Sequence, residues 1–420
     1  MKHRTDNYDG FDVHHEKRES LERPFDYNIT VNCADLGAQM GLRSEENPDK
    51  RAMRNSFLAN LALLGHAGPE AKIFYSRAND EYARHSQYAP SWFTRSVVTQ
   101  VIDRVVDDGW ALGRKTKPSR YATKRSTVWP TRKLQAALAV LSKQDFRQGL
   151  RNGILLRDEN KKLVPYPETS ETRAMRRQVV EQNEALASVE IGICDVTESG
   201  QYVASNGRTV NTLRCALYRV FNRSRWDLGG RYYGGYWQQL PKNDRAQITL
   251  DGAATFEHDI SACHLKMAYA RVGAAIPQSD PYRLEVLASI LNAPEVVCRS
   301  VVKQAVLILI NAETAPSAHR AIRRHFSEAN LPRDNAKEVV ALIKASMPDL
   351  KPVWHSGLGL ELQRYDSDVA MRVMRSMRKK GVPVLPVHDS FIVPILAEQQ
   401  LKEAVEREFD VCLSKLRSGN

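Results

Sequence analysis

The segment between residues 382 and 394 constrains the fold more than any other part of the chain. Its two apolar runs, VPVLPV and FIVP, flank the polar triplet His388-Asp389-Ser390. Short apolar runs separated by a turn are typical of a β-hairpin with buried strands. A polar His-Asp pair among residues that must be buried incurs a desolvation cost unless a metal ion or a charged partner compensates it. We therefore expect a hairpin that presents Asp389 at its tip.

A second acid, Asp259, precedes Asp389 by 130 residues. It ends a strand-like run and comes directly before an amphipathic helical pattern that extends to Ala270. Strand ends are often solvated, so an exposed acid without a chemical role is the alternative interpretation for both aspartates.

Four short patterns resemble motifs of a known polymerase superfamily. Three of them match motifs A, B and C in the order of the family, and the fourth lies upstream of motif A. The segment from Asp259 to Tyr269 resembles motif A of family A DNA polymerases, with its Asp, Ser and Leu in register. The run VHDSF around Asp389 is similar to motif C of the phage-type single-subunit RNA polymerases. Arg299 and Lys303 match the R-x-x-x-K of motif B. Upstream, the run DLGGRYY around Arg231 resembles the D-x-R-G-R-x-Y segment of those RNA polymerases, with a Gly in place of its first Arg.

The resemblance covers about residues 215 to 420 and implies an enzyme with two metal ions. Asp259 and Asp389 would bind two Mg²⁺ ions, with Mn²⁺ as a possible substitute, because Mg²⁺ prefers oxygen ligands. Arg299 and Lys303 lie at i and i+4 on one helix face, where they would contact the incoming triphosphate. The remaining implied site residues are His388 in the catalytic group, Ser261, His264 and Asn311 at the nucleotide and its sugar, and Arg231, Tyr233 and Arg245 at the nucleic acid.

Two of these positions depart from the family pattern. Asn311 stands where motif B usually carries a Tyr or Phe that stacks beneath the new base pair. His264 stands where the DNA polymerases have Glu and the RNA polymerases have Gly, beside the sugar 2′ position. A bulky ring there disfavours a ribose hydroxyl, yet imidazole can also hydrogen-bond to one. The sequence leaves the choice between dNTPs and NTPs open.

The first third of the chain predicts a DNA-binding module. An amphipathic pattern from Ser91 to Trp110 predicts a helix that Gly109 ends, and a basic hairpin is expected to follow it. This order resembles the recognition helix and wing of winged helix-turn-helix domains; the alternative is a helix with a solvated basic loop. The cations expected at DNA are Arg95, Arg114, Lys115, Lys117, Lys124 and Arg125.

Charge and cysteine usage agree with a nucleic-acid partner inside the cell. Lys and Arg outnumber Asp and Glu by 61 to 49, a formal net charge of +12, which favours a polyanionic partner. The six cysteines form no C-x-x-C pair, so neither a zinc knuckle nor a disulfide framework is expected. No apolar run approaches the roughly 20 residues of a membrane span. We expect a cytoplasmic protein without a signal peptide or a membrane partner.

These observations together predict an α+β protein with a right-hand polymerase palm and fingers, preceded by a mostly helical winged-helix-like domain. The predicted parts are a flexible arm (1–45), a winged-helix-like domain (46–135), a helical connector (136–185) and a palm and fingers domain (186–420). The expected function is template-directed nucleotidyl transfer in replication of a plasmid, phage or mobile element, with DNA synthesis favoured. Its partners would be a DNA template, a primer or nascent strand, and nucleoside triphosphates. The alternatives are a single-subunit RNA polymerase or primase, and a DNA-binding replication or regulatory protein without catalysis.

Overall fold

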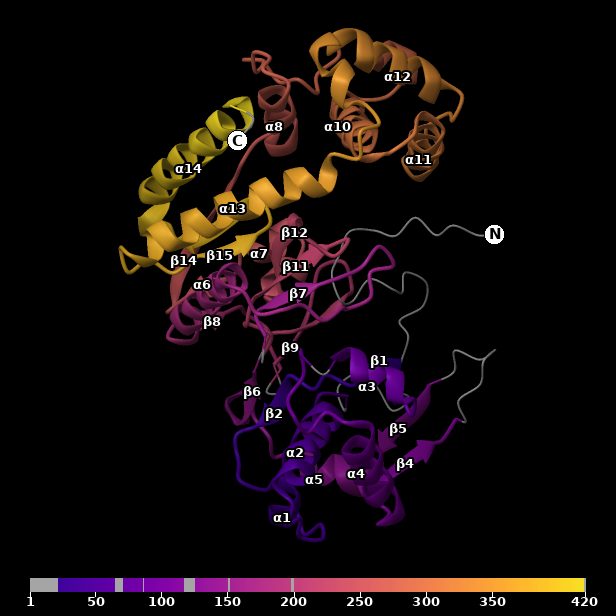
Figure 1. The fold of residues 1–420 in the computed structure, drawn as a ribbon, viewed down its shortest axis with the longest axis vertical. Helices are drawn as coiled ribbons and strands as arrows, with labels where there is room; N and C mark the ends of the chain where they lie inside the picture. Colours follow the sequence, from indigo (N-terminus) through magenta and orange to yellow (C-terminus); the bar gives the residue numbers. More distant parts are fainter. Residues whose placement is uncertain are drawn as a thin grey trace. The chain divides into compact units, whose positions relative to one another are not determined.

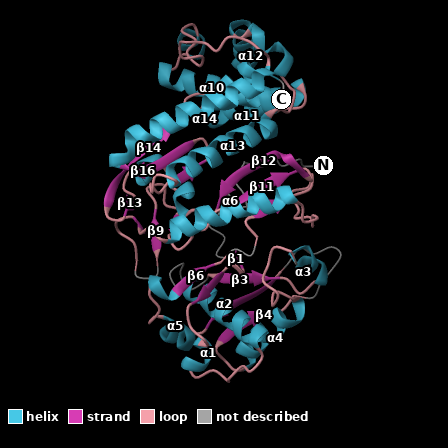
Figure 2. Ribbon diagram, turned by 60° about the vertical axis from the view of Figure 1, so that its left-hand side comes forward, coloured by secondary structure: helices cyan, strands magenta, loops and turns pink. Residues whose placement is uncertain are grey.

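The computed structural model describes residues 22–64, 71–85, 87–116, 125–149, 152–197 and 200–418. Helices and several small, mostly antiparallel sheets alternate along the chain, which confirms the predicted α+β class (Figures 1 and 2). The chain forms two compact units: unit 1 comprises Met1–Val220 and Tyr232–Thr255, and unit 2 comprises Phe221–Arg231 and Phe256–Asn420. Within the described residues, no helix is both long enough and apolar enough to cross a membrane.

The first part of unit 1 is built on a four-stranded sheet of order β1-β3-β5-β4, in which only the β1–β3 pair is parallel. Buried side chains such as Phe57, Ile73, Ile102 and Val128 form the core between this sheet and its helices. Its strands, with the separate β2–β6 pair, are β1 (Glu22–Pro24), β2 (Ile29–Val31), β3 (Lys72–Tyr75), β4 (Ala111–Arg114), β5 (Ser126–Pro130) and β6 (Phe146–Gln148). Its helices are α1 (Leu36–Gln39), α2 (Pro48–Leu64), α3 (Asn79–His85), α4 (Arg95–Asp107), α5 (Arg132–Leu138) and η1 (Lys143–Asp145).

Helix α4 begins at Arg95, four residues after the predicted start at Ser91, and the β4–β5 hairpin follows it as predicted. The hydroxyl of Thr94 caps the helix by accepting a hydrogen bond from the Val97 amide at 3.3 Å. Gly109, with φ of +75°, lets the chain turn away just after the helix ends. Strands β4 and β5 then pair in an antiparallel register from Ala111 opposite Pro130. The tip of this hairpin, with Lys117 and Lys124, lies outside the described residues.

The predicted arm and connector contain more regular structure than their polar sequences indicated. Residues 22–45, assigned to a flexible arm, include β1, which pairs with β3, and β2, which pairs with β6. Ile29 and Val31 of β2 are buried, so burial of these alternating apolar side chains holds this polar stretch in unit 1. The connector 136–185 is likewise only partly helical, because β6 and β7 fall within it.

The second part of unit 1 contains small sheets and the long helix α6. The capping box of α6 uses two threonines: Thr169 accepts from the amide of Thr172, whose hydroxyl accepts from the amide of Thr169. The strands are β7 (Ile154–Leu156), β8 (Ile191–Gly192), β9 (Gln201–Val203), β10 (Thr209–Asn211), β11 (Tyr218–Asn222), β12 (Arg225–Tyr233), β13 (Thr249–Leu250) and β14 (Ala253–Asp259). The helices are α6 (Ser170–Ala187), η2 (Tyr236–Gln239) and α7 (Lys242–Arg245). Strands β11, β12 and β14 each pass from one unit to the other along their length.

Unit 2 contains two strands of its own, β15 (Leu385–Val387) and β16 (Ser390–Pro394), at the end of a sheet of order β15-β16-β14-β13-β8. Helices α13 and α14 lie side by side, and α8 packs against both of them (Figures 1 and 2). Helices α10, α11 and α12 form a second cluster in this unit (Figure 1). The helices are α8 (Cys263–Arg271), α9 (Leu287–Leu291), α10 (Glu295–Asn311), α11 (Ala315–Glu328), α12 (Asn335–Ser346), η3 (Pro348–Val353), α13 (Gly359–Arg378), η4 (Ile395–Ala397) and α14 (Glu398–Ser418).

Candidate active site

The hairpin predicted around Asp389 is present. Strands β15 and β16 are antiparallel, with Val387 opposite Ser390, so His388 and Asp389 form a two-residue turn. His388 has a φ of +59°, the left-handed region that L-residues adopt at a cost. The buried neighbours Phe391 and Ile392 fix this turn in unit 2.

The turn brings Asp389 next to the end of the strand that carries Asp259. Strands β14 and β16 are neighbours in the sheet, and the amide of Ile260 donates to the carbonyl oxygen of Asp389 at 3.1 Å. Burial raises the pKa of Asp389 above its ordinary value, and the negative charge of Asp259 raises it further. Two residues far apart in sequence thus place their carboxylates in one electrostatic environment in unit 2.

A third carboxylate, which the sequence analysis missed, lies in this environment. Asp366 of α13 is 1% exposed, and the Nε of Arg231 donates to its two oxygens at 3.2 and 2.9 Å. The Nη2 of Arg231 also donates to Asp366, and Nε2 of His264 lies 2.7 Å from Asp366 Oδ2. Burial opposes ionisation of Asp366, but Arg231 and His264 outweigh burial, so the pKa of Asp366 lies below its ordinary value.

The sequence around Asp366 contains a pattern, an apolar helix face with one acid in it, that could have identified this residue. Leu362, Asp366, Val369, Val373 and Met377 recur at the spacing of one helix face, and all are buried. A single acid within such an apolar stripe requires a charged partner in the core. The partner itself, Arg231, is 135 residues away and could not be identified from the stripe.

Arg231 and His264 therefore have contacts within the protein that the sequence analysis did not predict. Arg231 was expected to contact nucleic acid, but its guanidinium is 15% exposed and bound to Asp366. His264, expected beside the sugar, is 12% exposed, and its Nε2 also lies 3.1 Å from Nη2 of Arg231. Asp366 fixes the position of both side chains within unit 2.

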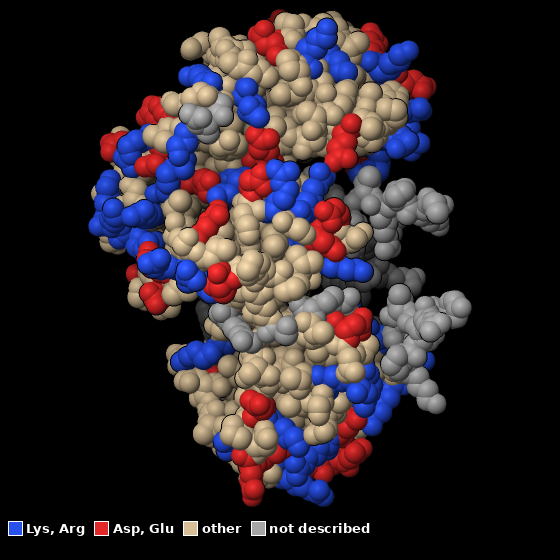
Figure 3. Space-filling model, in the orientation of Figure 1, with Lys and Arg blue, Asp and Glu red and all other residues tan. Residues whose placement is uncertain are grey.

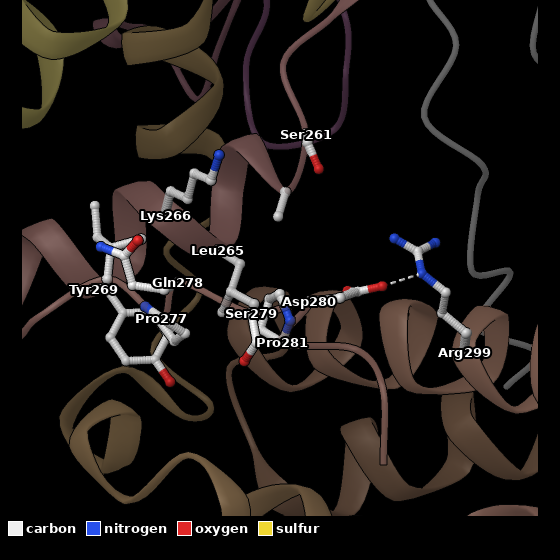
Figure 4. A pocket seen from close by; sticks show the side chains of 12 residues that line it. Ser261, Leu265, Lys266, Tyr269, Pro277, Gln278, Ser279, Asp280, Pro281 and Arg299 are labelled. Atoms are coloured by element: carbon white, nitrogen blue, oxygen red, sulfur yellow. Dashed lines mark hydrogen bonds and ion pairs between the residues drawn. The ribbon is translucent and has the colours of Figure 1, made fainter. Parts of the chain in front are cut away.

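A cavity of about 480 Å³ in unit 2 brings together two predicted nucleotide contacts, Ser261 and Arg299. Ser261 comes from the turn after β14, Lys266 from α8 and Arg299 from α10 (Figure 4). The Nε of Arg299 donates to Oδ2 of Asp280 at 2.5 Å, and its guanidinium lies 5.7 Å from the centre of the Tyr282 ring. Two cations from separate helices thus line one cavity.

The other predicted residues of α10 are placed differently. Lys303 lies one helical turn after Arg299 and is exposed. Asn311 is the last residue of α10, about 18 Å along the helix axis from Arg299 at 1.5 Å per residue. It packs against Gly359, where an added Cβ would lie 1.8 Å from Oδ1 of Asn311. Asn311 therefore contributes to helix packing at the start of α13.

Glu257 is a further acid that the sequence analysis did not select. The hydroxyl of Ser390 donates to Oε1 of Glu257 at 2.8 Å. Glu257 and Asp259 are two residues apart on β14, so both side chains lie on the same face of the strand. A carboxylate two positions before a strand-end acid is the pattern that could have identified it.

The other predicted nucleic-acid contacts lie in unit 1. Tyr233 and Arg245 belong to unit 1, whereas Arg231 belongs to unit 2. The ring centre of Tyr233 lies 6.2 Å from that of Tyr218, and Nη1 of Arg245 donates to the carbonyl oxygen of Leu240 at 2.8 Å.

The described cations around the hairpin have local contacts of their own. Nε of Arg95 donates to the carbonyl of Arg77 at 2.8 Å, and Lys115 lies 3.2 Å from Asp103. Arg125 stacks its guanidinium 4.7 Å from the Phe74 ring centre, and Arg114 is exposed. On the face shown in Figure 3, Lys and Arg side chains alternate with Asp and Glu.

The residues present fit a divalent cation held by few protein ligands. Within the part of the chain that the structure describes, no group of three or more His, Cys, Asp or Glu could hold a metal ion. Mg²⁺ usually keeps several waters and binds through one or two carboxylates plus substrate phosphates. Asp259 and Asp389 provide two carboxylates, and burial together with the negative charge of Asp259 raises the pKa of Asp389, an effect that a bound cation would oppose.

No protein-family model matches this chain, and no curated protein matches it either. The resemblance to the polymerase superfamily therefore depends on the motifs and on the geometry of the residues within them.

Proposed function

We propose that this protein is a template-directed nucleotidyltransferase that extends a nucleic-acid strand by two-metal phosphoryl transfer. The observation that carries the proposal is the convergence of Asp259 and Asp389 at neighbouring strand ends, with the pKa of Asp389 raised by burial and by Asp259. Carboxylates that share a partly buried site favour a bound cation, and the order of the surrounding motifs matches a polymerase palm.

The reaction forms a bond from the 3′ hydroxyl oxygen of the strand to the α-phosphorus of a nucleoside triphosphate. The bond from that phosphorus to the pyrophosphate oxygen breaks, and the hydroxyl proton passes to water. Mg²⁺ bound by the carboxylates would supply an activated hydroxyl and charge stabilisation. Asp259 and Asp389 hold this charge in place, while Arg299 and Lys266 lie at the cavity where the triphosphate would bind.

The same geometry supports DNA synthesis over RNA synthesis. His264 follows Asp259 by five residues, and Asp366 and Arg231 hold its ring in one position. A fixed ring beside the sugar acts mainly by its bulk, which disfavours a 2′ hydroxyl. A single-subunit RNA polymerase or primase remains the second candidate, supported by the resemblance of the segments around Arg231 and Asp389 to the RNA polymerase motifs.

Primer extension with all eight nucleotides, on primed and unprimed DNA templates, tests the proposal. We expect Mg²⁺-dependent extension that falls more than roughly a hundredfold in Asp259→Asn and in Asp389→Asn, with template binding retained. Asp410→Asn, which changes an exposed acid of α14, is the matched control. Absence of extension by the wild-type protein, together with intact DNA binding, would support a non-catalytic DNA-binding protein instead.

A further inference from the structure

Arg231 is the cation that could compete with a metal ion for the candidate site. Its Nη2 lies 3.1 Å from Nε2 of His264. The residue before His264, Cys263, donates its amide to the carbonyl of Ile260, whose own amide donates to the carbonyl oxygen of Asp389. A guanidinium forms two parallel hydrogen bonds with a carboxylate, and such a pair would occupy the oxygens that Mg²⁺ needs. The site therefore requires Arg231 to be held elsewhere.

Asp366 provides that alternative partner. It accepts hydrogen bonds from both Nε and Nη2 of Arg231, which fixes the orientation of the planar guanidinium. The carboxylate is 1% exposed on the buried face of α13, so packing fixes its position. Nε2 of His264 lies 2.7 Å from Oδ2 of Asp366, so this carboxylate contacts both Arg231 and His264.

We propose that Asp366 is a positioning residue that retains Arg231 and His264, and so keeps Asp259 and Asp389 available for divalent cations. The proposal rests on the proposed function, because it concerns the same carboxylates. It assigns a role to a residue outside all four polymerase-like motifs. In this arrangement the buried carboxylate of Asp366 accepts hydrogen bonds of Arg231 that Asp259 or Asp389 would otherwise accept.

Competition between a protein cation and a metal ion predicts a specific pattern across variants. In Asp366→Asn, Arg231 loses its charged partner and turns toward the remaining carboxylates, so cation binding weakens about tenfold. Adding Arg231→Gln removes the competitor and restores binding. Arg231→Gln alone changes binding less than about threefold, because the wild-type guanidinium is already retained by Asp366.

Binding of Mn²⁺ without nucleotide, measured by electron paramagnetic resonance on the full chain, tests this pattern. Asp368→Asn is the matched control, because Asp368 lies on the same helix and pairs with Arg364 of that helix. Circular dichroism verifies that each variant is folded. If Asp366→Asn does not fold, Asp366→Glu keeps the charge but moves the carboxylate, and weaker Mn²⁺ binding is again expected.

Unchanged Mn²⁺ affinity in a folded Asp366 variant would overturn the proposal. Failure of Arg231→Gln to restore affinity in the double variant would overturn it as well. A wild-type protein that binds no Mn²⁺ would instead contradict the proposed function, so the two failures are distinguishable.

Discussion

At the scale of single residues, the candidate site retains a carboxylate whose ionisation the fold opposes. Burial and the charge of Asp259 raise the pKa of Asp389, while the Arg231 charge moderates the effect. A carboxyl with a higher pKa in the folded than in the unfolded protein binds its proton more tightly when folded. The metal-free protein therefore loses stability as the pH rises through the folded pKa of Asp389.

Asp389→Asn should accordingly stabilise the metal-free protein at neutral pH, by a few degrees in melting temperature. The difference should disappear near pH 3, about one unit below the ordinary aspartate pKa of about 3.9, where Asp389 is largely protonated in both states. Thermal unfolding in the presence of a chelator, from about pH 3 to pH 8, measures this. Asp410→Asn is the control; equal stability of Asp389→Asn and the wild type at pH 8 would contradict the argument.

A second residue-scale prediction concerns sugar choice. If His264 excludes the 2′ hydroxyl by its bulk, His264→Gly should raise NTP use relative to dNTP use by roughly 10 to 200-fold. If the imidazole hydrogen-bonds the hydroxyl, the same change should lower NTP use. The ratio of kcat/KM for one matched NTP and dNTP pair distinguishes these outcomes. An unchanged ratio would mean that His264 does not lie beside the sugar.

At the scale of elements, helix α4 and the β4–β5 hairpin form the DNA-binding candidate of unit 1. The hydroxyl of Thr99 donates to the carbonyl of Arg95 at 2.8 Å and Thr99 is buried, so this side chain is not part of the exposed surface of α4. Lys115 is paired with Asp103, which Arg77 also binds through both of its terminal nitrogens at 2.9 and 2.8 Å. The cations of the hairpin therefore differ in how far nearby carboxylates already neutralise them.

We expect this difference between the hairpin cations to appear in the salt dependence of DNA binding. Each phosphate that a cation neutralises contributes about 0.9 to the slope of log affinity against log salt concentration. Changing Lys115, Lys117, Lys124 and Arg125 together to Gln should flatten the slope, whereas Lys115→Gln alone should change it little. Fluorescence anisotropy across a salt series measures both. An unchanged slope in the fourfold variant would assign DNA binding to other parts of the chain.

At the scale of the whole molecule, the chain crosses between its two units within strands. Strand β12 belongs to unit 2 up to Arg231 and to unit 1 from Tyr232, and β14 changes unit between Thr255 and Phe256. A third crossing lies in β11, between Val220 and Phe221. The crossings in β12 and β14 lie close in sequence to residues of the candidate site, Arg231 and Asp259. The formal charge of +12 belongs to the chain as a whole, which favours a polyanionic partner but does not determine where it binds.

The sequence by itself determined the local elements whose signals are local. The turn at His388-Asp389 follows from two apolar runs, and α4 follows from its apolar periodicity and from Gly109, although its start at Arg95 was not predicted. The adjacency of Asp259 and Asp389 was implied by the resemblance to the polymerase motifs, in which both aspartates bind the same pair of metal ions. In each case the information lies within about twenty residues or in a recognisable pattern.

Only the tertiary structure decided which side chains share an environment. Asp366 meets Arg231 and His264 across 135 and 102 residues, and nothing in their local patterns specifies these partners. Strands β1 and β2 were likewise not predicted, because the sequence around them is polar and their partners, β3 and β6, are distant in sequence. The physical reason is that burial of a charge is decided by partners from distant segments, and the packing of complete elements brings those segments together.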